Sequence, residues 1–323
     1  RVVLLGDLQA TRDTAERLGI GVELVPVTRE DLGRGVPPAA GGARLRLPLL
    51  APAATLARPL RAAERRPGRP SVAAARVAYG SIRGAVELAQ ARVVDAICTA
   101  PINKEWFARA RVASTGHTEI LAELTRSDVR LMMAYCDLRV VLATTHLALR
   151  DVPGALTVGG VRDTILIAAR HLERWFGIER PRVAVCALNP HASDGGVYGD
   201  EEARIIAPAI ARARAARVDA IGPVPADTLF SAVGPRCDGV VAMYHDQGLI
   251  PVKQLGVHEA VNVTLGLPFV RTSPDHGTAY DLAGRGTADP RSMRAALDMA
   301  LELARVERRR MRAPSPKRSA PAA

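Results

Sequence analysis

The stretch RVVLATTH, residues 139–146, is a short apolar run that ends in a histidine. Two later stretches repeat this arrangement: RVAVCALN (182–189) is followed by His191, and GVVAMYH (239–245) ends in His245. Apolar runs of this length, rich in β-branched residues, are typical of strands that are buried on both faces. The three runs therefore predict buried strands with a histidine at or just past the carboxyl end of each.

Helix-length segments alternate with apolar runs along the rest of the chain, which predicts an α/β protein with a largely parallel sheet. The length of 323 residues favours two lobes rather than one. The other expected strands are 2–6, 44–51, 93–100, 129–135 and 260–266. The expected helices are 10–18, 71–91, 117–125, 160–177, 200–216 and 291–312.

The formal net charge of +11 is concentrated in two stretches, residues 58–69 and the segment from Arg305 to Arg318. Both stretches contain proline and lack the interleaved aromatic residues on which nucleic-acid bases stack. They are typical of a solvated loop and a basic tail, so we expect no nucleic-acid partner. No apolar run approaches the roughly 18 residues that a membrane-spanning helix needs, so we also expect no membrane partner.

The four cysteines indicate the cellular compartment of the protein. Cys98, Cys136, Cys186 and Cys237 lie far apart, each in or beside an apolar run. This spacing favours buried, reduced thiols rather than a zinc site or a disulfide framework. No secretory signal is evident after Arg1. We therefore expect a cytoplasmic protein.

Three of the seven histidines, His146, His191 and His245, stand at equivalent places in the predicted sheet. Ligands of open α/β sheets bind at the carboxyl edge, so these imidazoles are expected to converge. Three protein ligands and one open position are typical of a catalytic metal site. Asp246 and Asp227 could join as ligands, as partners of a histidine or as a base, and Asp227 could equally cap a short helix.

A second group of residues suits an anion. In TGHTEILAEL (115–124), His117 and Thr118 open a predicted helix, whose first turn offers free N–H groups to an anion. Lys253, Asn262 and Arg271 follow the His245 strand and could clamp a phosphate and a carboxylate. The glycine-rich dinucleotide fingerprint is absent, because Gly284-Arg285-Gly286 lacks a third glycine. Its absence does not exclude NAD, which other folds bind differently.

Seven ordered blocks of the chain closely resemble the 4-hydroxythreonine-4-phosphate dehydrogenase (PdxA) family. They are CTAPINKE (98–105), GHTEILAEL (116–124), TTHLALRDVP (144–153), ALNPHASDGG (187–196), GPVPADTLF (222–230), AMYHDQGLIPVK (242–253) and VNVTLGLPFVRTSPDHGTAYDLAGRG (261–286). The resemblance covers nearly the whole chain up to the basic tail.

This resemblance implies the isocitrate/isopropylmalate dehydrogenase type of α/β fold, with two α/β lobes and a cleft between them. The lobes implied are 1–115 with 270–312 on the cofactor side, and 116–269 on the metal and dimerisation side. Residues 313–323 are expected to form a disordered basic tail. The family works as a homodimer with its active sites at the subunit interface.

The resemblance also implies roles for particular residues. His146, His191 and His245 match ligands of one divalent ion (zinc, magnesium or cobalt) that is shared between subunits. His117, Thr118, Lys253, Asn262 and Arg271 match substrate-binding positions. His276, Gly277 and Thr278 match the loop that binds NAD or NADP.

The implied reaction belongs to pyridoxal 5'-phosphate biosynthesis. 4-Phosphooxy-L-threonine is oxidised by NAD(P)⁺ to a β-keto acid, which decarboxylates to 3-amino-2-oxopropyl phosphate. The metal lowers the pKa of the substrate hydroxyl. Lys104, Lys253 and Asp246 are the candidates for the group that takes the hydroxyl proton.

Three alternatives stay open from the sequence. A paralogue of the same family would oxidise 4-phospho-D-threonate or 4-phospho-D-erythronate with the same metal and phosphate residues. Outside the dehydrogenases, a metal-dependent phosphate-ester hydrolase and a non-catalytic metabolite-binding protein use similar groups. An assay with each phosphorylated acid separates them.

The chain departs from the family pattern in two places. The usual glycine-rich turn, GDPAGIGPE, does not precede RVVLLGD (1–7), and Ser193 stands where NPHAGE has glycine. Because glycine is often chosen for its backbone freedom, we expect the loop after His191 to be slightly re-aimed.

Overall fold

The computed structural model describes residues 1–34, 45–114, 116–231, 234, 236–256 and 258–312. The chain divides into two compact units: unit 1 holds Arg1–Val129 and Val257–Leu297, and unit 2 holds Arg130–Gly256 and the residues from Asp298 onward. These boundaries differ from the lobes expected at 1–115 with 270–312 and at 116–269. The reason is packing: Ile120, Leu121, Leu267 and Phe269 belong to the core of unit 1. The expected tail, 313–323, lies outside the described residues.

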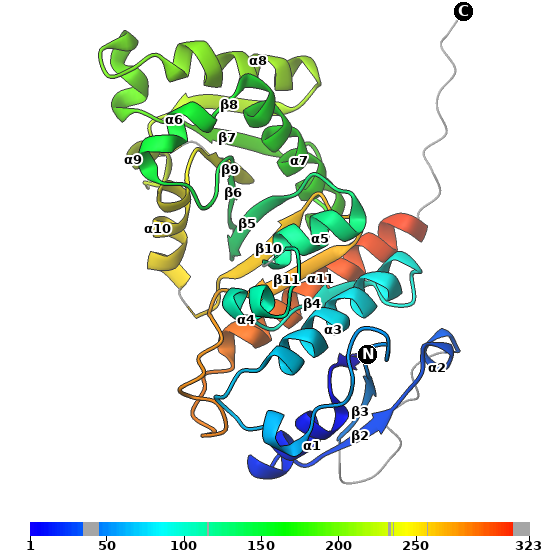
Figure 1. The fold of residues 1–323 in the computed structure, drawn as a ribbon. Helices are drawn as coiled ribbons and strands as arrows, with labels where there is room; N and C mark the ends of the chain where they lie inside the picture. The colour runs from blue at the N-terminus through cyan, green and yellow to red at the C-terminus, as the bar shows by residue number, and fades with distance from the viewer. Residues whose placement is uncertain (35–44, 115, 232–233, 235, 257, 313–323) are drawn as a thin grey trace, which may run out of the picture. The chain divides into compact units, whose positions relative to one another are not determined.

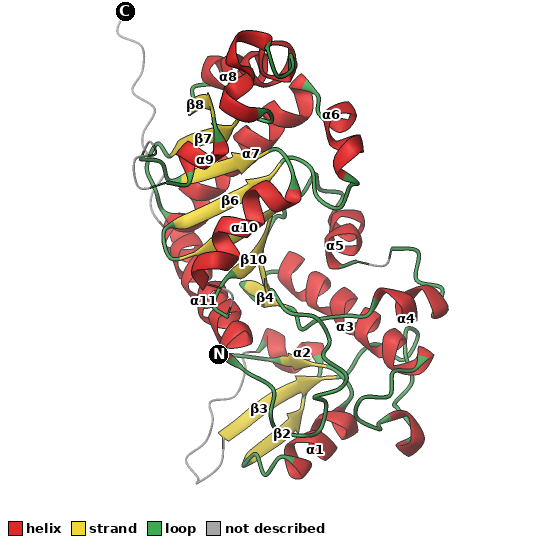
Figure 2. Cartoon of the chain, turned by 90° about the vertical axis from the view of Figure 1, so that its left-hand side faces the viewer, coloured by secondary structure: helices red, strands yellow, loops and turns green. Residues whose placement is uncertain are grey.

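Unit 1 contains two sets of strands (Figures 1 and 2). The first is a parallel sheet with the order β1 (Leu4–Leu5), β3 (Leu45–Leu50) and β2 (Val22–Pro26). In the second, β4 (Ala96–Cys98), β11 (Val270–Pro274) and β10 (Val261–Leu265) lie side by side in this order. β4 is parallel to β11, and β10 is antiparallel to it.

The helices of unit 1 are α1 (Leu8–Arg17), α2 (Arg29–Gly33), α3 (Val72–Gln90), α4 (Lys104–Arg109) and α5 (His117–Thr125). α3 begins where the Ser71 side chain accepts the N–H of Ala74, as an N-cap should. Its residues Ile82 and Val86 pack in one cluster with Phe107. Burial of each such side chain contributes roughly 1.5–3 kcal/mol, so this cluster anchors α3 and α4.

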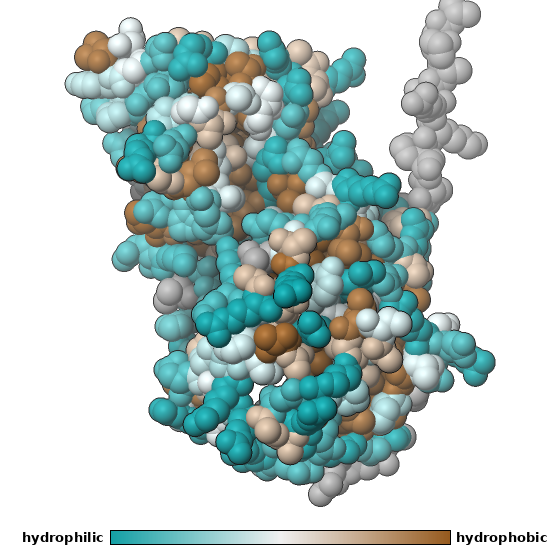
Figure 3. Space-filling view, viewed as in Figure 1, coloured by the Kyte–Doolittle hydropathy of each residue, from teal (hydrophilic) through white to brown (hydrophobic). Residues whose placement is uncertain are grey.

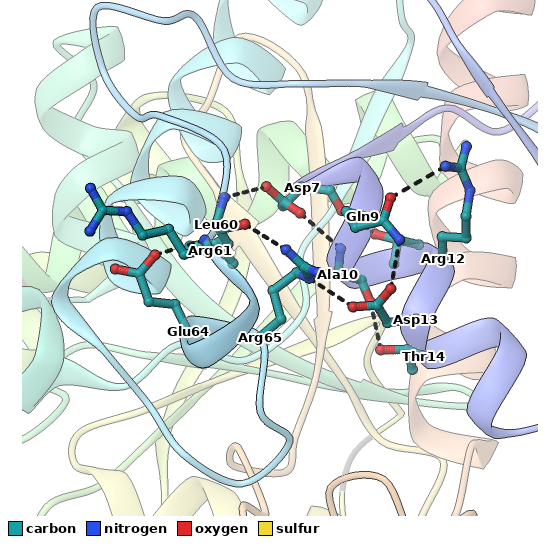
Figure 4. A network of polar contacts seen from close by, with 11 residues as sticks. Asp7, Gln9, Ala10, Arg12, Asp13, Thr14, Leu60, Arg61, Glu64 and Arg65 are labelled. Atoms are coloured by element: carbon teal, nitrogen blue, oxygen red, sulfur yellow. Dashed lines mark hydrogen bonds and ion pairs between the residues drawn. The ribbon is translucent and has the colours of Figure 1, made fainter.

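The basic stretch 58–69 is held to α1 by polar contacts (Figure 4). Asp7 accepts the N–H of Ala10 and the N–H of Leu60, both over 2.8 Å. Arg65 donates to Asp13 over 2.7 Å. The stretch is therefore an ordered loop whose charges are partly paired.

Unit 2 contains one set of strands in the order β5 (Arg130–Tyr135), β6 (Leu138–Leu142), β9 (Gly239–Ala242), β7 (Arg182–Cys186) and β8 (Asp219–Val224). β5 and β6 form an antiparallel hairpin, and β6, β9, β7 and β8 are parallel to one another. All four residues of β9 are buried, in agreement with the uninterrupted apolar run.

The helices of unit 2 are α6 (Val152–Ala155), α7 (Val158–Phe176), α8 (Ala207–Ala215), α9 (Ala226–Leu229) and α10 (His245–Gly256). A π-helical segment, Glu202–Ile206, leads into α8. α7 begins at the N-cap Thr157 and ends at Gly177, whose φ of 71° is the left-handed conformation that glycine adopts without strain. α11 (Arg291–Arg312) begins in unit 1 and continues in unit 2.

The expected α/β class is confirmed, and every expected strand and helix overlaps an observed one. Three strands and one long helix were not expected: β2, β8, β11 and α10. β2, β8 and β11 contain proline and polar residues (VELVP, DAIGPV, VRTSP), and α10 contains Pro251, so their local patterns are weak. The last three residues expected in the His245 strand instead lie in the turn into α10 and at its first residue.

The expectation of four buried cysteines is wrong for Cys136. Cys186 is buried, and Cys98 and Cys237 are partly buried, but Cys136 is exposed in the turn between β5 and β6. A hairpin turn faces solvent whatever apolar run precedes it. In the described part of the chain no single helix is long and apolar enough to cross a membrane; only the bent pair Leu149–Ala155 and Val158–Phe176 passes that test together.

Candidate functional site

The carboxyl ends of β6 and β9 bring two of the three sequence-predicted histidines together. β6 and β9 are parallel neighbours, so the segments that leave them start side by side. His146 follows β6 and His245 begins α10; the centroids of their rings lie 5.6 Å apart. The Thr144 hydroxyl donates to the carbonyl of Met243 over 2.7 Å and ties the two segments together.

A carboxylate stands beside one of these rings. Nδ1 of His245 lies 2.7 Å from Oδ1 of Asp246. A carboxylate in this position keeps the proton on Nδ1 and leaves the lone pair of Nε2 available to a cation. We call His146, His245 and Asp246 the histidine site. Two imidazoles, one of them oriented by a carboxylate, are donors that suit a divalent ion such as zinc or cobalt.

The third histidine, His191, lies in an exposed loop after β7. The loop is left-handed over four consecutive non-glycine residues, with φ of 53° at His191, 55° at Ala192, 71° at Ser193 and 44° at Asp194. This conformation costs a non-glycine residue roughly 1–2 kcal/mol. Contacts from outside the loop must therefore hold it.

Glu202 makes those contacts. It is 4% exposed, and its Oε1 accepts the N–H groups of Leu188 and Asn189 over 2.8 and 2.7 Å. Its Oε2 accepts the side-chain amide of Asn189 over 2.9 Å and the hydroxyl of Ser193. Burial acts to raise the pKa of Glu202, but these donors outweigh it and hold the pKa below its usual range.

Glu202 is not among the expected site residues, because the pattern of residues 200–216 predicts a single helix. The available signal was an acidic residue on the helix face that carries Ile205 and Ile206, three and four positions on. Gln247 was missed as well. It accepts the N–H of Met243 over 2.7 Å and donates to the carbonyl of Ala187 over 2.6 Å, which connects the segment before His245 with the one before His191.

One chain does not complete a three-histidine centre. Among the described residues no group of three or more His, Cys, Asp or Glu side chains could hold a metal ion. The ring of His191 instead lies near Tyr198, with centroids 6.4 Å apart. Asp227 is exposed in the first turn of α9, and Lys253 is exposed on α10.

In unit 1, Arg271 is a buried cation in β11. It is 2% exposed, and its guanidinium donates to the hydroxyls of Thr264 over 2.9 Å and of Thr99 over 2.6 Å. Its Nε is buried with no hydrogen-bond partner. Burial lowers the pKa of Arg271 to about 10, so the group stays charged at neutral pH.

No carboxylate among the described residues forms an ion pair with Arg271. Cys98, the one acidic group that affects it, has its own pKa raised by burial and therefore remains a thiol at neutral pH. An unpaired buried charge costs several kcal/mol, so folded proteins keep one only where something repays the cost. An anionic ligand would do so.

His117 and Thr118 form the first turn of α5. Burial first, and the charge of Arg271 second, lower the pKa of His117 to about 3. His117 is therefore a neutral imidazole at physiological pH, able to donate or accept a hydrogen bond beside Arg271. His117 adds an uncharged polar group near Arg271 and leaves the positive charge to Arg271.

Asn262 lies on β10 opposite Ser273 of β11. Alternate residues share a face, so Asn262, Thr264, Arg271 and Ser273 point to one side of this strand pair. Oδ1 of Asn262 is buried without a hydrogen-bond partner. We call Arg271, Asn262, Thr264, Thr99 and His117 the anion site; Thr99 and Thr264 were missed because only the strand register reveals them.

The sequence-predicted cofactor loop follows β11. His276 and Gly277 are exposed and Thr278 is partly buried, and Nδ1 of His276 lies 2.9 Å from the carbonyl oxygen of Gly277. Further along, Gly284 has a φ of 78° and a Cβ there would lie 2.9 Å from Pro67, so the loop packs closely on the 58–69 loop. Lys104 is exposed at the first position of α4.

Residues 1–300 match the family model described as pyridoxal phosphate biosynthetic protein PdxA. The 4-hydroxythreonine-4-phosphate dehydrogenase of Geobacter metallireducens is 55% identical over 242 residues, which cover 74% of this chain and 71% of that protein. The D-threonate 4-phosphate dehydrogenase of Salmonella typhimurium is 47% identical over 239 residues, 73% of each protein.

The fold is likewise similar to a solved one. The crystal structure of 4-hydroxythreonine-4-phosphate dehydrogenase from Klebsiella pneumoniae superposes with a TM-score of 0.82 at 39% identity, covering 94% of this chain and 90% of that one. A match of this extent confirms the resemblance drawn from the seven sequence blocks. The chain therefore belongs to the PdxA family of pyridoxal phosphate biosynthetic proteins.

Proposed function

We propose that this protein is a cytoplasmic 4-hydroxythreonine-4-phosphate dehydrogenase. It oxidises 4-phosphooxy-L-threonine with NAD or NADP to a β-keto acid, which loses carbon dioxide to give 3-amino-2-oxopropyl phosphate. The family and the activity of its 55% identical relative, as that protein's name gives it, support this assignment. The observation that carries it is Arg271, a buried cation with no acidic partner among the described residues.

The anion site binds the charged end of the substrate. The guanidinium of Arg271 already donates to two threonine hydroxyls, and its unpartnered Nε leaves one donor for a phosphate or carboxylate oxygen. His117, neutral at physiological pH, and Thr118 add uncharged polar groups at the start of α5. Lys253 and Asn262 complete the proposed substrate set. Binding the phosphate away from the reacting carbon orients that carbon without taking part in the chemistry.

The histidine site holds one divalent ion: zinc, magnesium or cobalt. The fit rests on the donors, because two imidazoles lie 5.6 Å apart between centroids and Asp246 orients one of them. A bound ion would lower the pKa of the substrate hydroxyl and stabilise the enolate that decarboxylation forms. Asp246, Lys104 and Lys253 remain the proposed acceptors of the hydroxyl proton, and Asp227 is proposed to support the site.

The third ligand, His191, is supplied by a second copy of the chain. Large side chains are exposed in the segments that follow each of the three histidines. They are Leu147 (48%), Leu149 (68%), Val197 (71%), Tyr198 (53%), Ile250 (64%) and Leu255 (63%). Figure 3 shows apolar patches within the hydrophilic surface of unit 2. Burial of these side chains in a homodimer interface, expected to exceed about 2,000 Å² in total, accounts for their exposure in one chain.

The cofactor binds at the loop that includes His276, Gly277 and Thr278. A bound NAD or NADP would supply the acceptor for the hydride that leaves the carbon bearing the hydroxyl. The chain's part is to present polar groups: residues His276 and Gly277 are exposed. The close packing of this loop at Gly284 holds it in place and limits the reorganisation needed on binding.

One relative favours a second candidate function. The 47% identical protein from Salmonella typhimurium is named D-threonate 4-phosphate dehydrogenase. Oxidation of 4-phospho-D-threonate or 4-phospho-D-erythronate would use the same metal and phosphate residues. Only 4-phosphooxy-L-threonine has an amino group to be recognised. An assay therefore distinguishes the substrates, whereas the residues of the anion site do not.

The test is a steady-state assay of the purified dimer with Zn²⁺, Mg²⁺ or Co²⁺, in which reduced nicotinamide is followed at equal concentrations of the three phosphorylated acids. The proposal expects the highest kcat/KM with 4-phosphooxy-L-threonine. A higher kcat/KM with either of the other acids would assign the second function. No reduced nicotinamide with any of the three would overturn both.

A further inference from the structure

The loop that carries His191 has a strained backbone. It is left-handed from His191 to Gly196, and four of these residues are not glycine. Its side chains are mostly exposed, Ser193 being the buried one. This backbone strain makes the position of the imidazole sensitive to the side chains that hold the loop from outside.

The Glu202 carboxylate grips this loop on both sides of His191. It binds backbone and side-chain donors three and two residues before the histidine, at Leu188 and Asn189, and the Ser193 hydroxyl two residues after it. No Lys or Arg among the described residues pairs with Glu202. Its buried charge is thus compensated by the loop donors and by the N–H of Glu202 itself, an arrangement that an apolar residue at this helix position could not reproduce.

A glycine completes the cradle. Gly199 has a φ of 134°, and a Cβ there would lie 2.7 Å from the side-chain nitrogen of Asn189. The chain therefore closes directly over the Asn189 amide that Glu202 binds. The same Asn189 amide also donates to Glu201 over 2.8 Å, so two carboxylates hold it.

We propose that Glu202 is the positioning residue for His191. Its buried carboxylate holds the left-handed loop, so the imidazole is already in its metal-binding conformation before the metal binds. This inference rests on the proposed metal-dependent function. Ser193 contributes to the same arrangement. Its hydroxyl donates to Glu202, and this hydrogen bond offsets part of the free energy that the left-handed backbone of Ser193 costs.

The test uses the dimeric protein and the variants Glu202→Gln and Asp200→Asn. Glutamine keeps one oxygen for the two backbone N–H groups but turns an N–H₂ toward the donors of Asn189 and Ser193. Asp200→Asn removes the same charge two residues away, where the ion pair with Arg204 is exposed. We expect Glu202→Gln to weaken Co²⁺ binding by about 10–100-fold in a calorimetric or absorption titration, and Asp200→Asn to change it less than about threefold.

A second readout does not need metal. In the metal-free dimer, the amides of Leu188 and Asn189 should exchange faster with deuterium in Glu202→Gln than in the parent or in Asp200→Asn, because their acceptor is weakened. Unchanged exchange together with unchanged Co²⁺ affinity would overturn the proposal. If the parent protein itself binds no Co²⁺, the metal function fails, and the exchange measurement alone decides the role of Glu202.

A rescue variant separates positioning from a general loss of stability. Ser193→Gly removes the strain at a φ of 71°. Placed on Glu202→Gln, it should recover part of the lost Co²⁺ affinity, because the loop then needs less holding. A double variant that binds Co²⁺ as weakly as Glu202→Gln, with the same melting temperature, would show that loop strain is not what Glu202 balances.

Discussion

Arg271 and His191 reach their places by different means. Arg271 stands on β11 between two hydrogen-bonded strands, and the register alone sets Thr264 and Thr99 against its guanidinium. His191 stands in a left-handed loop and depends on a carboxylate eleven positions along the chain. A sheet positions a side chain as a by-product of folding, whereas a loop needs a residue dedicated to that task.

The two sites also differ in completeness. The anion site has all of its groups within unit 1, with Arg271, Thr99 and Thr264 buried and His117 and Asn262 partly buried. The histidine site is exposed, has two of its three histidines together, and is surrounded by exposed apolar side chains. We expect the anion site to bind its ligand strongly, because electrostatic interactions are stronger away from water. We expect the exposed histidine site to depend on a second copy of the chain. The following experiments test each half of this contrast.

The largest effect is expected from breaking the dimer. Ile250→Asp puts a charge on a side chain that is 64% exposed in one chain and lies on the helix that begins at His245. We expect monomers by light scattering and a near-complete loss of dehydrogenase activity, since His191 of a second copy is then missing. Ile20→Asp, at a side chain 54% exposed in unit 1, should leave the dimer and its activity unchanged. A fully active Ile250→Asp monomer would end the shared-site interpretation.

Arg271→Met should have the next largest effect. Loss of a buried, charge-assisted contact to the substrate should lower kcat/KM by about 10²–10³-fold. The melting temperature should not fall, because the variant removes an unpaired buried charge and keeps an apolar stem of similar length. Arg29→Met, in an exposed ion pair with Glu87, is the control. A large loss of stability in Arg271→Met would show that Arg271 is a structural residue instead of a ligand for an anion.

Asp246→Asn tests the histidine site. An asparagine no longer favours the proton on Nδ1 of His245, so we expect metal affinity to fall by about 10-fold while KM for the phosphorylated substrate changes less. Calorimetric metal titration and steady-state kinetics measure the two effects. A change confined to KM would place Asp246 with the substrate and not behind the imidazole.

The smallest effect is a pH dependence that belongs to the anion site. Burial holds the pKa of His117 at about 3, below its ordinary value of 6.5. The unfolded chain therefore binds a proton that the folded chain refuses, and stability is lost as pH falls from about 6.5 toward about 3. Between pH 7 and pH 5 the loss should be about 1–2 kcal/mol. Urea unfolding should show this difference in the parent and a smaller one in His117→Asn; equal losses in both would contradict the assignment.

Much of this protein could be predicted from the sequence because its signals are local. Uninterrupted apolar runs such as 139–142 and 182–186 predicted the central strands of unit 2, and the histidines after them were identified from position alone. Runs interrupted by polar residues or proline, as in β11 and α10, carried no such signal. The unit boundaries also differed, since they follow which residues share a core.

The sequence by itself determined the α/β class, the family, and the residue types available to bind an anion and a metal. Only the tertiary structure decided that Arg271 has no acidic partner among the described residues, that Thr99 and Thr264 hold it, and that Glu202 holds the His191 loop. The physical reason is distance along the chain. Thr99 and Arg271 are 172 positions apart in the chain, and strand register brings them together. A buried charge is compensated by whichever polar groups the fold brings to it.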